Sequence, residues 1–284
     1  MTSSPDQIRS AYDHCERAAR GHYENFPVAS LLVPRGIRRH VAAIYAFARE
    51  ADDFADEAEH EGHRLELLDD WGRMLDRAAR GSADHPVFVA IAHTIETRGI
   101  PVQPLRDLLE AFRRDVTVAS YGTFDELLGY CRLSANPVGR LLLHLFGRAK
   151  DPLIEMSDAI CTALQLANFW QDVSIDLDKG RCYIPGEDLR RFGCSDRDLR
   201  SRRPTPAFKE LMRFQVERTR SLFERGAGLP AAVGGRLGFE LKLVLQGGLR
   251  ILERIDSVEG DVFGRRPVLT VPDWGRMIVR AALT

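Results

Sequence analysis

Residues 165–178 read QLANFWQDVSIDLD. At 3.6 residues per turn, the polar side chains Gln165, Asn168, Asp172 and Asp176 fall on one stripe of a helix. The residues around this stripe are mostly apolar, which is typical of a helix buried inside a bundle. Because an acidic stripe on a buried helix needs a polar environment, we expect it to face an internal cavity.

A similar stripe occurs earlier in the chain, in residues 45–57, which read YAFAREADDFADE; in chain order we call it the first stripe and that of residues 165–178 the second stripe. Tyr45, Arg49, Asp52 and Asp56 fall within about 60° of helical arc. Asp53 and Glu57 form another acidic pair on an offset face, where we expect solvation to suffice. Like charges four residues apart cost a helix a few tenths of a kcal/mol, so something should compensate the pair on the stripe.

Together the two stripes supply four carboxylates and an amide, which are the hard oxygen ligands that Mg²⁺ takes together with substrate phosphate. One DxxxD pattern is a weak signal, because acid pairs on solvated helix faces are common. Two such stripes on facing helices, each with polar companions, favour a magnesium site. Asp69, Asp70, Asp196 and Asp198 are interpreted as solvated surface residues.

Residues 179–185, KGRCYIP, directly follow the second stripe. A glycine between Lys179 and Arg181 suits a flap that closes over a diphosphate, where the cations bind the remaining oxygens. The alternative is a helix C-terminus with favourable basic residues.

The chain as a whole has a helical pattern. Apolar residues recur every three or four positions over its 284 residues, and Gly and Pro divide it into segments of helical length. Ser4 and Pro5 predict a helix start, with the helix running toward Arg20. We expect one all-α domain over residues 1–284, with about ten helices and with short helical pieces between Gly180 and Pro206.

Composition excludes several classes of protein. Forty Lys and Arg balance 41 Asp and Glu, which argues against nucleic-acid binding. The longest stretch free of these four residue types, 159–171, is too short to span a bilayer, and residues 1–6 lack the features of a secretory signal. We therefore expect a cytoplasmic protein whose five widely spaced cysteines are reduced thiols.

Residues 45–57, residues 165–185 and the spacing between them resemble the squalene/phytoene synthase family over nearly the whole chain. The resemblance implies an all-α isoprenoid-synthase bundle with a central hydrophobic cavity and a Mg²⁺ cluster that binds an allylic diphosphate. The implied metal ligands are Asp52, Asp56, Asn168, Asp172 and Asp176. Arg49 and Arg181 would bind the diphosphate, helped by Lys179 and Asn25, while Tyr45 and Gln165 would line the polar end of the cavity.

Finer features resemble the bacterial branch that makes hydroxysqualene for hopanoid biosynthesis. They lie in residues 22–30, 134–140 and 169–173. The chain has Glu24 and Asn25 where condensing members usually carry Ser or Lys, and Gln171 where they have Arg. Arg132 and Leu133 replace an expected tyrosine, although Tyr130 is near. These departures leave fewer cations for two diphosphates and therefore favour a substrate with one.

The resemblance thus implies that Mg²⁺, Arg49 and Arg181 promote ionisation of a C30 prenyl diphosphate, presqualene diphosphate, and that water captures the rearranged cation. Tyr130, Asn136 or Gln165 could orient the water. No GxGxxG turn is present, so reduction to squalene should need another enzyme; a presqualene diphosphate synthase and a hydroxysqualene reductase are the implied pathway partners. The alternatives are a head-to-head prenyl transferase and a catalytically inactive family member that acts as an assembly or binding protein.

Apolar side chains would shield the cation from nucleophiles. The candidates are Phe26, Phe47, Phe169, Trp170 and residues 141–143, although each also reads as ordinary core. A C30 substrate would partition into lipid, so Val28 to Pro34 is a candidate peripheral membrane contact. The same segment is equally consistent with a place in the hydrophobic core.

Overall fold

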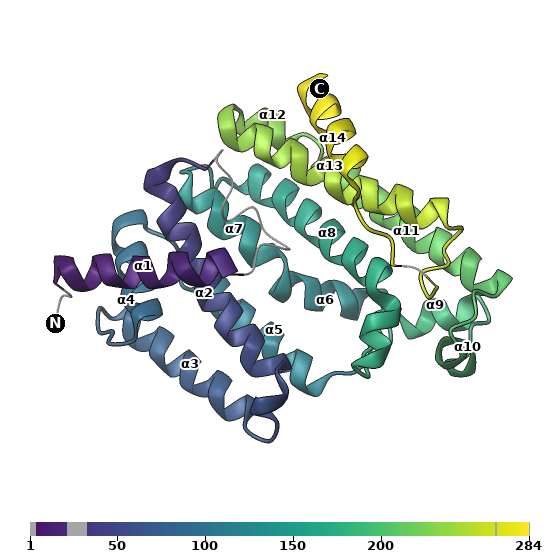
Figure 1. The fold of residues 1–284 in the computed structure, drawn as a ribbon, viewed down its shortest axis with the longest axis horizontal. Helices are drawn as coiled ribbons and strands as arrows, with labels where there is room; N and C mark the ends of the chain where they lie inside the picture. Colours follow the sequence, from purple (N-terminus) through teal and green to yellow (C-terminus); the bar gives the residue numbers. More distant parts are fainter. Residues whose placement is uncertain (1–3, 22–32, 265, 284) are drawn as a thin grey trace. The chain divides into compact units, whose positions relative to one another are not determined.

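The computed structural model describes residues 4–21, 33–264 and 266–283, and the described chain is helical (Figure 1). Within those ranges, Ser120 and Cys182 form an isolated parallel β-bridge. The all-α prediction is therefore confirmed. The described residues divide into two compact units, residues 1–117 with 137–150 and residues 118–136 with 151–284, and each is described by itself. The prediction of one domain stays a prediction.

The first unit is built around the long helix α2. Its helices are α1 (Pro5–Gly21), α2 (Arg35–Asp56), the 3₁₀ turn η2 (Ala58–His60), α3 (Arg64–Ala79), α4 (Pro86–Arg98), α5 (Gln103–Thr117) and most of α7 (Asn136–Leu145). The predicted start of α1 is confirmed, because Ser4 Oγ accepts a hydrogen bond from the Gln7 N–H and Gln7 Oε1 accepts one from the Ser4 N–H.

Helices α1, α3, α4 and α5 pack on α2 and bury its apolar face. Phe47 of α2 is fully buried against Trp71 and Phe88, and Trp71 Nε1 donates a hydrogen bond to the Phe47 carbonyl oxygen at 3.2 Å. Phe47 is thus an ordinary core residue. This packing fixes the rotation of α2, so its polar stripe is held in one direction.

The second unit contains the remaining helices. They are α6 (Phe124–Ser134), α8 (Asp151–Asp178), α9 (Gly186–Arg191), α10 (Asp196–Ser201), α11 (Pro206–Gly226), α12 (Leu229–Val233), α13 (Gly235–Ser257) and α14 (Val271–Leu283). Helices α9 and α10 are the short helical pieces predicted after Gly180.

Helix α8 lies alongside α11 and α13 (Figure 1). A Cβ at Gly226 of α11 would lie 2.7 Å from the Met156 carbonyl oxygen, so the two backbones approach closely only because this residue is glycine. Trp170 is completely buried, and its Nε1 donates to Thr219 Oγ1 at 2.8 Å. These contacts fix α8 with Trp170 inward as core.

Candidate active site

A pocket of about 220 Å³ lies within the first unit, and Tyr45, Arg49 and Asp52 line it. The rest of its wall is apolar and comes from three helices: Val41, Ile44 and Ala48 of α2, Leu108 and Phe112 of α5, and Val138, Leu141 and Leu142 of α7. Three of the four residues predicted for the first stripe therefore share one cavity with apolar side chains. Such a pocket suits an amphiphile with a hydrocarbon chain and an anionic head group.

Arg49 is the cation of this pocket. Its Nη2 lies 2.5 Å from Asp53 Oδ1, and its Nη1 lies 3.4 Å from Asp52 Oδ2. Our expectation that Asp53 needs only solvent was wrong, because the i,i+4 spacing brings it within reach of the guanidinium. Arg49 Nε is buried and has no hydrogen-bond partner in the described structure. That N–H is available to an anionic ligand.

Of the other residues of the first stripe, Tyr45 lines the pocket and Asp56 does not. Burial raises the pKa of the Tyr45 phenol above its ordinary value, so the hydroxyl stays protonated and can donate a hydrogen bond. Asp56 is half-buried at the last position of α2 and is not among the residues that line the pocket.

The second stripe follows α8 as predicted. Gln165, Asp172 and Asp176 are half-buried, while Asn168 is exposed. Asp176 lines a small cavity of about 10 Å³ together with Arg181 and Tyr183. Helix α8 therefore presents its acids in a polar strip beside a buried apolar face.

The segment after α8 is held by backbone hydrogen bonds. Gly180 has a φ of +74°, and the Arg181 N–H donates to the Asp176 carbonyl oxygen at 2.8 Å. Further along, the Cys182 N–H donates to Ala119 O at 2.8 Å and the Gly186 N–H to Tyr121 O at 2.9 Å. These bonds fix the course of the chain through Arg181, while Lys179 is exposed.

Aromatic side chains gather beside the second stripe. Phe169 and Tyr183 stack with ring centroids 3.8 Å apart, and Tyr130 lies 6.1 Å from Phe169 and 5.8 Å from Tyr183. Tyr121 packs against Tyr130 at 5.5 Å. The electron-rich faces of such rings can stabilise a cation. Tyr183 lies in the KGRCYIP segment, but no spacing in the sequence predicted a role for it.

The Asp172 carboxylate has a partner that the sequence analysis missed. Arg266 donates to both of its oxygens, at 2.5 Å to Oδ1 and 3.0 Å to Oδ2. The neighbouring Gln171 is buried, and its side-chain amide donates to the Pro267 carbonyl oxygen. Gln171, which stands where the family pattern has Arg, thus anchors the segment that brings a different arginine to Asp172.

The remaining predicted residues lie as follows. Asn136 is buried, and its Oδ1 accepts a hydrogen bond from Thr162 Oγ1 at 2.9 Å. Asn25, Phe26 and most of the stretch Val28 to Pro34 lie outside the described residues. All five cysteines are free thiols in the described structure, and burial raises the pKa values of Cys15 and Cys131 to about 12, which keeps these two thiols protonated.

The residues of the two stripes fit a metal ion whose coordination is completed by oxygens of the substrate. The described part of the chain has no group of three or more His, Cys, Asp or Glu residues arranged to hold an ion by themselves. Mg²⁺ is usually bound through one or two carboxylates, and substrate phosphates complete its shell. Because each stripe carries two carboxylates, the donor set fits magnesium that binds together with a diphosphate.

Comparisons with known proteins identify the family of this chain. A model of the squalene/phytoene synthase family matches residues 19–273. A hydroxysqualene synthase of Zymomonas mobilis is 37% identical, covering 80% of this chain and 77% of that protein. A phytoene synthase of Arthrospira platensis is 30% identical, covering 97% of this chain and 93% of that protein.

Solved structures point the same way. A squalene synthase of Alicyclobacillus acidocaldarius is 43% identical with a TM-score of 0.86, covering 90% of this chain and 97% of that one. A dehydrosqualene synthase shares the fold with a TM-score of 0.87 at 21% identity, covering 98% of this chain and 97% of that one. The chain therefore belongs to the squalene/phytoene synthase family, the head-to-head isoprenoid synthases that convert prenyl diphosphates.

Proposed function

We propose that the protein converts presqualene diphosphate and water to hydroxysqualene and diphosphate in a Mg²⁺-dependent reaction. The observation that carries this proposal is the pocket of the first unit, whose apolar wall ends at Tyr45, Arg49 and Asp52. A C30 diphosphate has the matching chemistry, with a long hydrocarbon and a polyanionic head. Hydroxysqualene synthases of two bacteria are among the relatives, at 37% and 34% identity.

The first task of the site is to stabilise the leaving diphosphate. The proposed magnesium ligands are Asp52 and Asp56 on α2 and Asn168, Asp172 and Asp176 on α8. Bound Mg²⁺ would supply positive charge that stabilises the leaving diphosphate. Arg49 donates from its unpartnered Nε, and Arg181 and Lys179 donate to further oxygens. Tyr45, held protonated by burial, donates a neutral hydrogen bond.

The second task is to control the cation that ionisation leaves behind. The apolar wall of the pocket in the first unit offers no nucleophile to such a cation. In the second unit, the aromatic pair Phe169 and Tyr183 is the proposed source of negative electrostatic potential. Water then adds to the rearranged cation and releases a proton. Gln165, Tyr130 and Asn136 are the proposed water-orienting residues, and since Asn136 Oδ1 already accepts from Thr162, its amide N–H₂ is the group left to act.

Head-to-head condensation of two prenyl diphosphates is the main alternative, and the phytoene synthase relative at 30% identity favours it. Product analysis by mass spectrometry separates the two. The protein is incubated with Mg²⁺ and either presqualene diphosphate or farnesyl diphosphate, without a nicotinamide reductant. We expect hydroxysqualene from the first and no product from the second. Consumption of farnesyl diphosphate would overturn the assignment in favour of condensation.

An inactive assembly or binding protein is the alternative of a different class. Such a protein has no need of metal ligands, whereas both acidic stripes are intact in this chain. The test is the double variant Asp52→Ala with Asp172→Ala. If it turned over presqualene diphosphate or farnesyl diphosphate at the wild-type level, the stripes would have no role in catalysis.

A further inference from the structure

Large exposed hydrophobic side chains of the described residues are concentrated at α14 and the segment before it. Leu65 and Ile175 stand apart from this group, whose members are Val268, Val271, Trp274, Ile278 and Val279. Val271 is 86% exposed, Val279 58% and Trp274 52%. A contiguous exposed apolar surface of this kind marks an interaction site more often than scattered single residues do.

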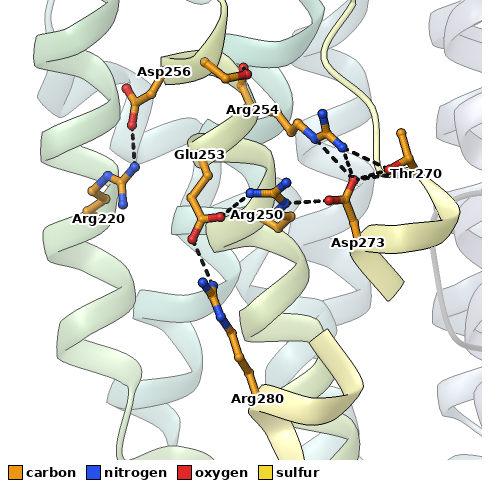
Figure 2. Close-up of polar contacts among 9 residues, drawn as sticks. Arg220, Arg250, Glu253, Arg254, Asp256, Thr270, Asp273 and Arg280 are labelled. Carbon is orange, nitrogen blue, oxygen red and sulfur yellow. Dashed lines mark hydrogen bonds and ion pairs between the residues drawn. The ribbon is translucent and has the colours of Figure 1, made fainter. Parts of the chain in front are cut away.

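Contacts with α13 fix the rotation of α14. Asp273 is 1% exposed and accepts hydrogen bonds from Arg250 Nε at 2.7 Å, Arg254 Nη2 at 2.6 Å and the Thr270 N–H at 2.8 Å, as Figure 2 shows. Met277 and Ala281, four and eight residues later, are also buried. Since these three residues hold one face against α13, the opposite face must point outward.

That outward face carries no charge over about 160° of arc, counting 100° per residue. Going round the helix from Trp274, the arc contains Ile278, Val271, Ala282, Gly275, Val279 and Pro272. We call these seven residues the apolar arc. Arg276 and Arg280 follow at one edge of the arc, and both are exposed.

The charges around the apolar arc are positive. Asp273 is the acidic residue of α14, and it is buried. Glu253 of α13 is neutralised between Arg250 at 2.5 Å and Arg280 at 2.9 Å (Figure 2). The helix therefore presents a wide apolar surface with a cationic border and no exposed acidic side chain of its own.

We propose that α14 docks the protein on an anionic phospholipid bilayer, with the apolar arc in the interfacial layer and Arg276 and Arg280 at the head groups. A helix that lies in a membrane surface combines these features: an apolar face with tryptophan, and arginine at its border. None of the described helices has the length and hydropathy that a bilayer span requires.

A second copy of the chain is a poorer occupant of this face. In a two-fold interface both copies would present Arg276 next to the Arg280–Glu253 pair, and α14 has no exposed acid to pair with Arg276. The lipid proposal does not rest on the proposed reaction, because it uses only the surface of α14.

Tryptophan fluorescence gives a direct test with the full chain. Of the three tryptophans, Trp71 and Trp170 are 3% and 0% exposed, so a change on vesicle addition reports Trp274. We expect phosphatidylglycerol vesicles to blue-shift the emission and to carry the protein upward in flotation, while phosphatidylcholine vesicles bind at least tenfold less. Trp274→Phe should remove the spectral shift and retain flotation.

Matched variants separate docking from folding. Ile278→Glu should lower the bound fraction at least tenfold, whereas Leu65→Glu, which also adds a charge at an exposed apolar side chain, should leave it unchanged with the same circular dichroism spectrum. Absence of flotation with phosphatidylglycerol, or equal flotation of Ile278→Glu, would overturn the proposal. A wild-type dimer in sedimentation that Ile278→Glu splits, without vesicle binding, would assign the arc to a second copy instead.

Discussion

Arg266 forms a bidentate ion pair with Asp172, with Nε 2.5 Å from Oδ1 and Nη2 3.0 Å from Oδ2, although 94 residues separate them in the chain. Asp172 is a proposed magnesium ligand, so the same two oxygens have two competing partners. A metal ion that uses them must displace the guanidinium or share the carboxylate with it.

Replacing Arg266 should therefore change the requirement for magnesium. Arg266 is 48% exposed, and an exposed pair contributes about 1 kcal/mol at most. We expect Arg266→Gln to lower the Mg²⁺ concentration for half-maximal turnover by up to about fivefold, with a melting temperature close to wild type. A magnesium titration at saturating substrate measures this effect. A higher requirement would show that Arg266 assists metal binding instead.

The acidic stripes should be essential to turnover and dispensable for folding. Asp52→Asn and Asp172→Asn each remove a proposed metal ligand, which should lower kcat/KM by about a hundredfold or more, because each weakens the charge that stabilises the leaving diphosphate. Asp70→Asn is the matched control, since Asp70 is an exposed acid on α3 that pairs with Arg73. Wild-type kinetics in either stripe variant would exclude that residue from the metal site.

If both stripes serve one reaction, the losses of kcat/KM caused by Asp52→Asn and Asp172→Asn should not be additive in free energy. The double variant Asp52→Asn with Asp172→Asn should then be little slower than the worse of the two single variants, as is found for residues that act as a unit. Steady-state kinetics of the four proteins gives the coupling. Fully multiplicative losses would contradict a shared role.

Tyr183 should act through its ring. Its stack on Phe169 places an aromatic face, and a cation–π contribution of about 1–2 kcal/mol corresponds to roughly tenfold in rate. We expect Tyr183→Leu to lower kcat about tenfold with little change in KM, and Tyr183→Phe to stay within about twofold of wild type. Equal losses in both variants would assign the role to the hydroxyl.

Acid should destabilise the first unit through the buried His40 and the half-buried His85 and His93. His40 is 1% exposed and bonds with Tyr12 and Thr94, and burial, with Arg98, Arg39 and His93 nearby, lowers its pKa to about 4. The pKa values of His85 and His93 are also lowered, mainly by burial. Between pH 6.5 and about 4 the unfolded chain binds more protons than the folded one, so stability falls as pH falls through this window.

For His40 the loss would amount to about 3 kcal/mol at full extent. Urea denaturation at several pH values measures it. His40→Gln should flatten the slope between pH 6.5 and about 4. A slope that His40→Gln does not alter would place the acid sensitivity elsewhere.

The sequence predicted the parts of the site that local periodicity determines. Tyr45, Arg49 and Asp52 share a face because a helix places i, i+4 and i+7 together, and the structure finds them in one pocket. The apolar surroundings of Asp172 likewise predicted a buried α8. Local periodicity could not predict the contacts that depend on tertiary structure.

Arg266 and Tyr183 illustrate that limit. Arg266 reaches Asp172 because Gln171 anchors Pro267, and no spacing rule connects residues so far apart in the chain. Tyr183 meets Phe169 because the segment after α8 turns back at Gly180 and hydrogen-bonds to residue 119. The close Arg49–Asp53 pair was missed for a different reason, since helical spacing allows several partners and packing selects one.

In the proposed reaction, water captures the cation that forms when diphosphate leaves. The direct measurement is mass spectrometry of the product formed from presqualene diphosphate and Mg²⁺ in water enriched in oxygen-18, without a reductant. We predict hydroxysqualene whose hydroxyl carries the heavy isotope, with no product when Asp52→Asn and Asp172→Asn are combined. A C30 product without the label, or no turnover of presqualene diphosphate by the wild-type protein, would exclude capture of the cation by water.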